Sequence, residues 1–150
     1  MLTDALLQLS SAQAVTATAF STNTIDLGVA RDIGQGEQLY ACITVDEAAT
    51  AAGAATVNFQ VVTSANANLS SPTIIGQTDA IAKTELTLGR KPIVVPIPSA
   101  VVLAQPVGQR YLGLQFTVGT GPLTAGKFTV NITQEDPGVG KYYASGFVAA

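Results

Sequence analysis

The sequence predicts an all-β protein, an antiparallel sandwich of two sheets, on two observations. The first is strict alternation of apolar and polar residues over 110–118 and again over 127–134. The apolar members are Leu112, Leu114, Phe116, Val118, Phe128, Val130 and Ile132. A period of two buries one face of a strand and leaves the other in water, which is typical of antiparallel sheets. The second is the repetition of about eight short segments at intervals of about ten residues, separated by Gly-, Pro- and Asn-rich turns.

The N-terminal segment, residues 1–12, has a different period. Leu2, Ala5, Leu6 and Leu9 stand at helical spacing, after Thr3 as a candidate N-cap. This spacing predicts a short N-terminal helix or arm. Its apolar stripe has two interpretations: it closes one end of the sheet core, or it docks on a neighbouring subunit.

Extended segments follow in the first half of the chain, with three loops between them. We expect strands over 13–20, 23–27, 38–45, 55–64, 73–76 and, with a looser pattern, 79–88. Gly34 and Gly36 mark 28–38 as an exposed loop. The Ala-rich residues 47–54 predict a loose turn or one helical turn, and the Asn- and Ser-rich residues 65–71 predict a mobile loop.

The second half continues with 93–97, which lies among Pro92, Pro96 and Pro98. Proline cannot donate to a strand ladder, so this segment predicts an edge strand. A turn at 106–108 precedes the two alternating strands, and an aromatic tail spans 137–150. Eight strands in two sheets make a jelly-roll-like sandwich, and we expect residues 1–150 to form a single domain.

Composition excludes several classes of partner. Only 11% of the 150 residues are charged, the net charge is −3, and the seven basic residues are scattered. Nucleic-acid binding needs a clustered basic face, so we expect no nucleic-acid partner. No window approaches the ~18 uninterrupted apolar residues of a membrane-spanning helix, and no basic segment opens the chain, so we expect no membrane partner and no export signal. The single Cys42 has no internal disulfide partner.

Residue types also argue against an enzyme. The chain has no histidine, which removes the common triads and His-based zinc sites, and one cysteine excludes thiolate clusters. Facing carboxylates are the remaining option, as in glycosidases. The candidates are Asp32, Glu37, Asp46, Glu47 and Asp79. All are expected in loops or at strand ends, where acids are usually solvated, and no Asp-rich calcium loop is present. We therefore expect no catalytic residue, no metal and no cofactor.

Several stretches, taken in order, resemble one family. They are MLTDALLQLSSAQAVT at 1–16, STNTIDLG at 21–28, RDIG at 31–34, RYLGLQFTVGTGPLTAGKFTV at 110–130 and GFV at 146–148. Together they resemble the capsid cement, or decoration, proteins of Bordetella-phage-type tailed phages. The resemblance implies a jelly-roll-like structural virion protein on the outside of an HK97-fold head, made in the host cytoplasm. It further implies an oligomer, a dimer or a trimer, that bridges neighbouring major capsid proteins, with no catalytic residues.

The sequence offers candidate contacts for such a role, and one alternative to it. The candidate interface residues are Leu2, Leu6, Leu9, Tyr142, Tyr143 and Phe147, because Tyr and Phe are enriched at interface cores. The tail aromatics have a second interpretation, packing back on their own sandwich. The alternative function is a carbohydrate-binding or adhesin-like jelly-roll module. It predicts clustered aromatics and a calcium site, whereas this chain has no tryptophan and scattered aromatics.

Overall fold

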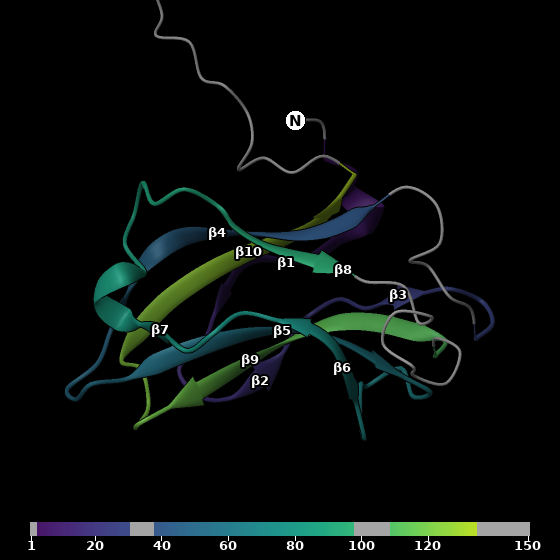
Figure 1. Ribbon diagram of the computed structural model, residues 1–150. Helices are drawn as coiled ribbons and strands as arrows, with labels where there is room; N and C mark the ends of the chain where they lie inside the picture. The colour runs from purple at the N-terminus through teal and green to yellow at the C-terminus, as the bar shows by residue number, and fades with distance from the viewer. Residues whose placement is uncertain (1–2, 31–37, 98–108, 135–150) are drawn as a thin grey trace, which may run out of the picture.

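The protein is a two-layered β-sandwich, seen in a computed structural model that describes residues 3–30, 38–97 and 109–134 (Figure 1). Within these residues the chain forms ten strands and two short 3-10 helices, η1 (Ala5–Leu7) and η2 (Lys83–Glu85). Every strand pairing is antiparallel. The prediction of an antiparallel sandwich is therefore confirmed.

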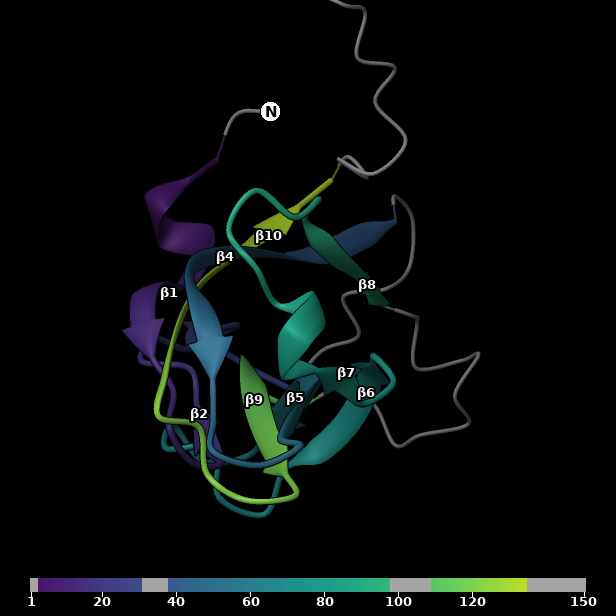
Figure 2. The ribbon, with the colours of Figure 1, turned by 90° about the vertical axis from the view of Figure 1, so that its left-hand side faces the viewer.

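Each layer is one sheet, and Figure 2 shows the two sheets from the side. Sheet A has the order β1 (Gln8–Ala14), β10 (Ala125–Thr133), β4 (Leu39–Thr50) and β8 (Ile93–Ile97). Sheet B is centred on β9 (Tyr111–Gly119) and β5 (Thr56–Ser64). Its flanks are β2 (Ala19–Phe20) and β3 (Ile25–Asp26), both on β9, and β6 (Thr73–Gln77) and β7 (Ile81–Ala82), both on β5. The ten strands thus fill eight strand positions, close to the number that the sequence predicts.

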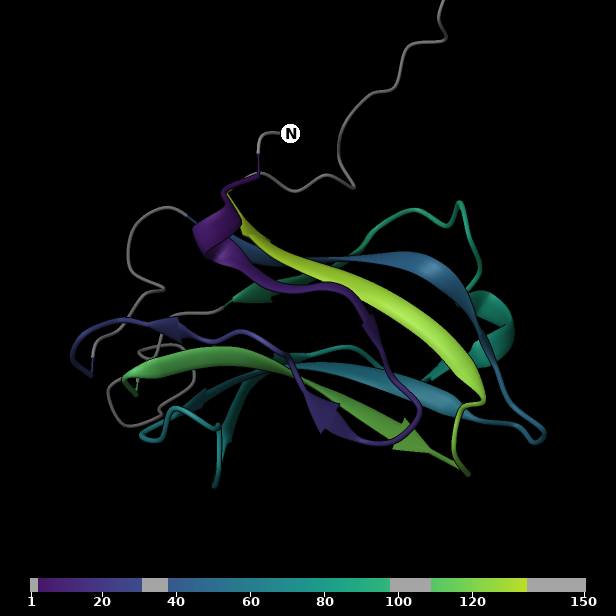
Figure 3. The ribbon, with the colours of Figure 1, turned by 180° about the vertical axis from the view of Figure 1, so that it is seen from behind.

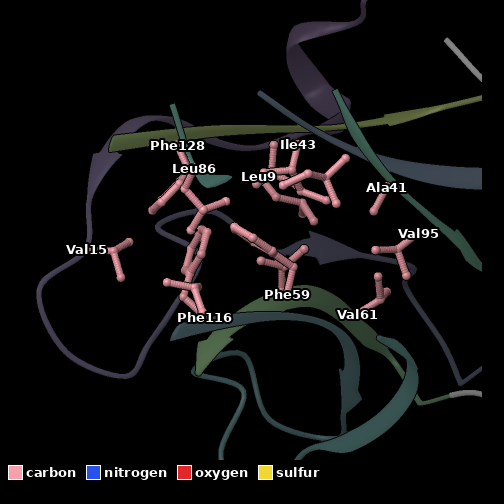
Figure 4. Close-up of a cluster of buried hydrophobic side chains, with 14 of the residues drawn as sticks. Leu9, Val15, Ala41, Ile43, Phe59, Val61, Leu86, Val95, Phe116 and Phe128 are labelled. Atoms are coloured by element: carbon pink, nitrogen blue, oxygen red, sulfur yellow. The ribbon is translucent and has the colours of Figure 1, made fainter. Parts of the chain in front are cut away.

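The core between the sheets contains three phenylalanines. Phe59 and Phe116 lie opposite each other in sheet B, and Phe128 reaches them from sheet A (Figure 4). All three side chains are fully buried. Their ring centroids lie 5.3 to 5.9 Å apart; Phe59 meets the other two edge-on, and Phe116 stacks on Phe128. These are favourable aromatic geometries, which fix how the two sheets face each other.

The two strands with the clearest alternation belong to different sheets. Leu112, Leu114 and Phe116 of β9 point inward from sheet B, while Phe128 and Val130 of β10 point inward from sheet A. The connection between them passes through Thr120 and Gly121, both with positive φ. Because β9 and β10 lie in different sheets, this loop crosses the sandwich instead of closing a hairpin.

The N-terminal segment is the largest departure from the sequence prediction. Only residues Ala5–Leu7 are helical, as one 3-10 turn, and Gln8–Ala14 is strand β1. Asp4, not Thr3, caps the turn. A single helical turn is not stable by itself, because ordering its backbone costs more free energy than its first hydrogen bond contributes. Pairing with β10 and burial of Leu9 stabilise the strand instead.

Three further segments differ from expectation. Residues 47–50, expected in a turn, continue β4, because Glu47 and Thr50 pair with Lys127 and Ala125 across a register shift. Residues 13–20 are not one strand, since β1 ends at Ala14 and the chain crosses to sheet B before β2. Residues 79–88 form only β7 and η2. In each case the length of the neighbouring strand, and not local propensity, decides where pairing ends.

The proline-flanked strand β8 is an edge of sheet A, as predicted. Pro96 lies opposite Tyr40 of β4 and faces solvent. The predicted loop at 28–38 falls mostly, and the turn at 106–108 and the tail at 137–150 wholly, outside the described residues.

The loop at 65–71, expected to be mobile, is tied to the outer face of sheet B. Leu69 has φ of 59° and is fully buried, and its side chain occupies the space above Gly113. The Ser64 hydroxyl donates to the Ser70 carbonyl at 2.6 Å and accepts from the Asn66 amide at 3.0 Å. These contacts join the loop to the end of β5 and to β9.

Candidate interaction surface

The η1 turn lies beside the end of β10 (Figure 3), and two of its three residues are Leu6 and Leu7. The Asp4 carboxylate accepts a hydrogen bond from the Leu6 amide at 2.9 Å, and the Asp4 carbonyl accepts one from the Leu7 amide at 3.0 Å. This cap fixes the turn. Leu6 is 84% exposed and Leu7 is 36% exposed. Leu6 is the most exposed large apolar side chain in the described residues, and the capped turn holds it where a partner can reach it.

A hollow adjoins the turn, between η1 and the ends of two strands of sheet A. Its volume is about 310 Å³, and its lining comprises Asp4, Leu7, Leu39, Ile132, Thr133 and Gln134. Leu7, Leu39 and Ile132 supply an apolar wall next to the exposed Leu6. The turn and the hollow together form what we call the N-terminal surface.

The structure divides the predicted leucine stripe. Leu9 is fully buried in the core on β1, so it anchors the segment and presents no contact surface. Of the stripe's described members, Ala5 and Leu6 are exposed, and Leu6 is the only large one that projects into solvent. Leu2, Tyr142, Tyr143 and Phe147 lie outside the described residues. The sequence reasoning did not include Leu7 in the candidate surface, because the helical spacing places it outside the apolar stripe, whereas the structure has it lining the hollow.

The predicted carboxylate candidates that the structure describes do not form a facing pair with a cleft between them. Asp46 accepts a hydrogen bond from the Thr129 hydroxyl at 2.6 Å, and Thr129 in turn accepts one from the Ala12 amide at 2.8 Å. Glu47 pairs with Lys127 at 2.7 Å and raises the pKa of that ammonium. Asp79 is exposed, and Asp32 and Glu37 lie outside the described residues. Asp46 and Glu47 thus connect neighbouring strands of sheet A.

One further acid fastens the rim of sheet B. Asp26 of β3 accepts two hydrogen bonds from Arg110, at 2.7 and 2.8 Å, and one from the Gly28 amide at 2.8 Å. The guanidinium also lies 5.1 Å from the centre of the Tyr111 ring. The hydrogen bonds from Arg110 lower the pKa of Asp26 to about 2. This bidentate pair holds β3 on β9.

The Asp26–Arg110 pair gives a pH-dependence with a defined sign. Because the folded pKa is below the ordinary value of 3.8, the stabilisation is complete above about pH 4 and disappears as the pH falls to about 2. We expect Asp26→Asn to lower the denaturation midpoint at pH 5 and to match the wild type near pH 2. The exposed Asp79 offers a matched control, since Asp79→Asn should change nothing at either pH. If the denaturation midpoint of the wild type exceeded that of Asp26→Asn by the same amount at pH 2 as at pH 5, this assignment would be wrong.

The outer face of sheet B is the second distinctive surface, and it contains neutral polar side chains. Pairing places Phe20, Gln115, Gln60 and Gln77 side by side across four strands. Thr117 and Asn58 face each other in the next row. We call these six residues the amide face. On the described strands of sheet B the only charged residue is Asp26, at the rim, where it pairs with Arg110, the residue that directly precedes β9.

Two features, a metal-binding cluster and a membrane-spanning helix, are absent from the part of the chain that the structure describes. Within residues 3–30, 38–97 and 109–134, no three His, Cys, Asp or Glu side chains come together as a metal site. Over the same residues no helix has the length and apolar character needed to cross a membrane.

Comparison with protein families adds one finding. The sequence model of the Bbp16 family matches residues 9–132, which run from Leu9 on β1 to Ile132 on β10 and so include all strands of both sheets. The chain belongs to the Bbp16 family. The Bbp16 name is that of a Bordetella phage protein, in agreement with the family resemblance of the sequence. The Bbp16 match begins after η1, so the exposed leucines precede it. A search of curated proteins found no match.

Proposed function

We propose that the protein is a capsid cement protein, which binds the outside of an HK97-fold phage head and stabilises it by bridging major capsid proteins. The observation that carries the proposal is the N-terminal surface: an exposed leucine on a capped turn, in a chain of the Bbp16 family. A rigid scaffold that presents a fixed apolar anchor suits binding to another protein, because little conformational entropy is lost on docking.

The strand order supports the jelly-roll topology that the resemblance implies. When β2 with β3 and β6 with β7 are each counted as one strand, sheet A has the order 1-8-3-6 and sheet B the order 2-7-4-5. The chain then alternates between the sheets at most of its connections, as the two Greek keys of a jelly roll require.

The physical mechanism is mass action. A protein that binds the assembled shell but not the free subunits stabilises the shell by its binding free energy. A symmetric head repeats that contribution many times, and an oligomer, dimer or trimer, adds avidity. The protein then resides on the outer surface of the virion after synthesis in the host cytoplasm. This role needs no catalytic residue and no cofactor.

The test is co-sedimentation of the purified protein with phage heads that lack it, followed by heating of the shells. We expect saturable binding and a higher disruption temperature. Leu6→Asp should weaken binding at least tenfold, because the leucine anchor would carry a charge that must be desolvated. Leu88→Asp is the matched control. Leu88 is another exposed leucine, with 64% of its surface accessible, but it lies outside the N-terminal surface, in the segment before β8.

The possible outcomes test the cement function and the N-terminal surface separately. If the wild type neither binds nor protects the heads, the cement function is wrong. If the wild type binds and Leu6→Asp binds equally well, the function stands and the N-terminal surface is not the contact. Circular dichroism of both variants checks that the fold is intact, which we expect because both leucines lie outside the core.

A further inference from the structure

The amide face of sheet B has the properties of a binding site for a neutral, hydroxyl-rich chain. We propose that it binds a glycan, independently of any contact with the phage head. The face is assembled only in the fold, since its residues come from strands β2, β5, β6 and β9. Its members are Phe20, Asn58, Gln60, Gln77, Gln115 and Thr117.

Part of the face is held in place by its own hydrogen bonds. The Gln60 amide nitrogen donates to the Gln77 side-chain oxygen at 2.7 Å, and the Thr117 hydroxyl donates to the Gln60 side-chain oxygen at 2.7 Å. This network connects three strands and orients the central glutamine. These side chains are therefore already ordered before a ligand binds, so binding loses less conformational entropy.

The neighbouring amides remain available. The side chains of Asn58 and Gln115 lie next to the network and make no hydrogen bond among the described residues. Each offers an amide N–H donor and a carbonyl acceptor on one group. A sugar hydroxyl is likewise both donor and acceptor, so one polyol chain can satisfy both halves of each amide.

The aromatic member of the row strengthens the case. Phe20 lies opposite Gln115, so both side chains point to the outer face, and Phe20 is not part of the core cluster. A partly exposed ring adds an apolar contact for the C–H face of a sugar. The row extends over four strands spaced about 4.8 Å apart, or about 14 Å in total, which suits an extended chain more than a single small molecule.

The lack of charge on the face decides among ligand classes. A phosphate, an acidic peptide or a basic peptide would lose hydration here without meeting an opposite charge. The six residues of the face carry no charge; at its borders lie Asp26, which Arg110 neutralises, and the exposed Asp79, two residues beyond Gln77. Leu69, fixed above Gly113, bounds the face on the side of Tyr111. A neutral oligosaccharide therefore fits this face better than a charged ligand.

The experiment titrates the full, isotope-labelled chain with maltoheptaose, cellohexaose and chitohexaose, each to about 10 mM, and follows amide chemical shifts by NMR. This range detects binding with millimolar Kd. We expect saturable shifts on β5, β9 and the side-chain amides of Asn58 and Gln115, with at least one sugar. Gln115→Ala and Asn58→Ala should each weaken that binding at least tenfold. Thr44→Ala, on the outer face of sheet A, is the control that should bind normally.

Three results would overturn the inference. They are no shift with any of the three sugars, shifts spread over both sheets, and sugar binding that survives both substitutions. The same two variants are then tested on phage heads, where we expect wild-type binding. If Gln115→Ala or Asn58→Ala loses head binding, the amide face belongs to a protein contact and not to a glycan site. Failure of the wild type to bind heads bears only on the cement function.

Discussion

Phe59→Ala should lower the free energy of unfolding by about 3–5 kcal/mol, the range observed for removing a buried phenylalanine. Phe59 is fully buried and touches both Phe116 of its own sheet and Phe128 of the opposite sheet. Its removal leaves a cavity where the sheets meet and breaks two edge-on aromatic contacts, each worth about 0.5–1.5 kcal/mol beyond burial. Chemical denaturation followed by circular dichroism measures the loss.

The surface provides the control for this substitution. Leu88 is 64% exposed, so Leu88→Ala should change the free energy of unfolding by less than about 0.5 kcal/mol. Phe59→Leu, which keeps most of the volume, should fall between the two. A loss below about 1 kcal/mol for Phe59→Ala would show that the phenylalanine cluster does not hold the sheets together.

Leu69→Ala should cost about 2–4 kcal/mol, the second largest effect that we expect. Leu69 is the one large apolar side chain of the loop 65–71, and it is fully buried. It packs where a Cβ on Gly113 would stand, with its Cδ1 atom occupying that space. Without this anchor the loop should open, and hydrogen exchange at residues 65–71 should accelerate with little change in β4 or β10.

Gly113→Ala supplies the complementary half of a double-mutant cycle. The added methyl group would collide with Leu69, so Gly113→Ala should destabilise the wild type and displace the same loop. In the Leu69→Ala background this collision is removed and only a 3.2 Å contact with Ser21 Oγ remains, so Gly113→Ala should cost much less there. The coupling energy should exceed about 1 kcal/mol, as for residues in direct contact. Additive effects would show that Leu69 and Gly113 act separately.

Much of the fold could be predicted because the alternation is local. Phe116 and Phe128 are expected inward from their own strands and are found there. The same pattern could not show that β9 and β10 lie in different sheets, because a period of two fixes which side of a strand is buried and not which strand is its neighbour. The extension of β4 to Thr50 was hidden for a related reason, since alanines have little strand propensity and pairing with β10 overrides it.

The candidate surface was predictable only in part. Leu6 and Leu9 are three residues apart, and a helical spacing places them on one face. The structure buries Leu9 and exposes Leu6, because the chain changes from a 3-10 turn to a strand between them. The amide face carried no signal in the sequence, because its members are distributed from Phe20 to Thr117 and each is an ordinary outward strand residue.

The sequence by itself determined the all-β class, the inward residues of the main strands, the edge position of the Pro-flanked strand and the family resemblance. Each of these depends on residue type and short-range spacing. The tertiary structure alone decided which strands pair, where β1 and β4 begin and end, and which exposed residues meet to form the two surfaces. Those outcomes depend on contacts between residues far apart in the chain, whose free energy exists only once both sheets have formed.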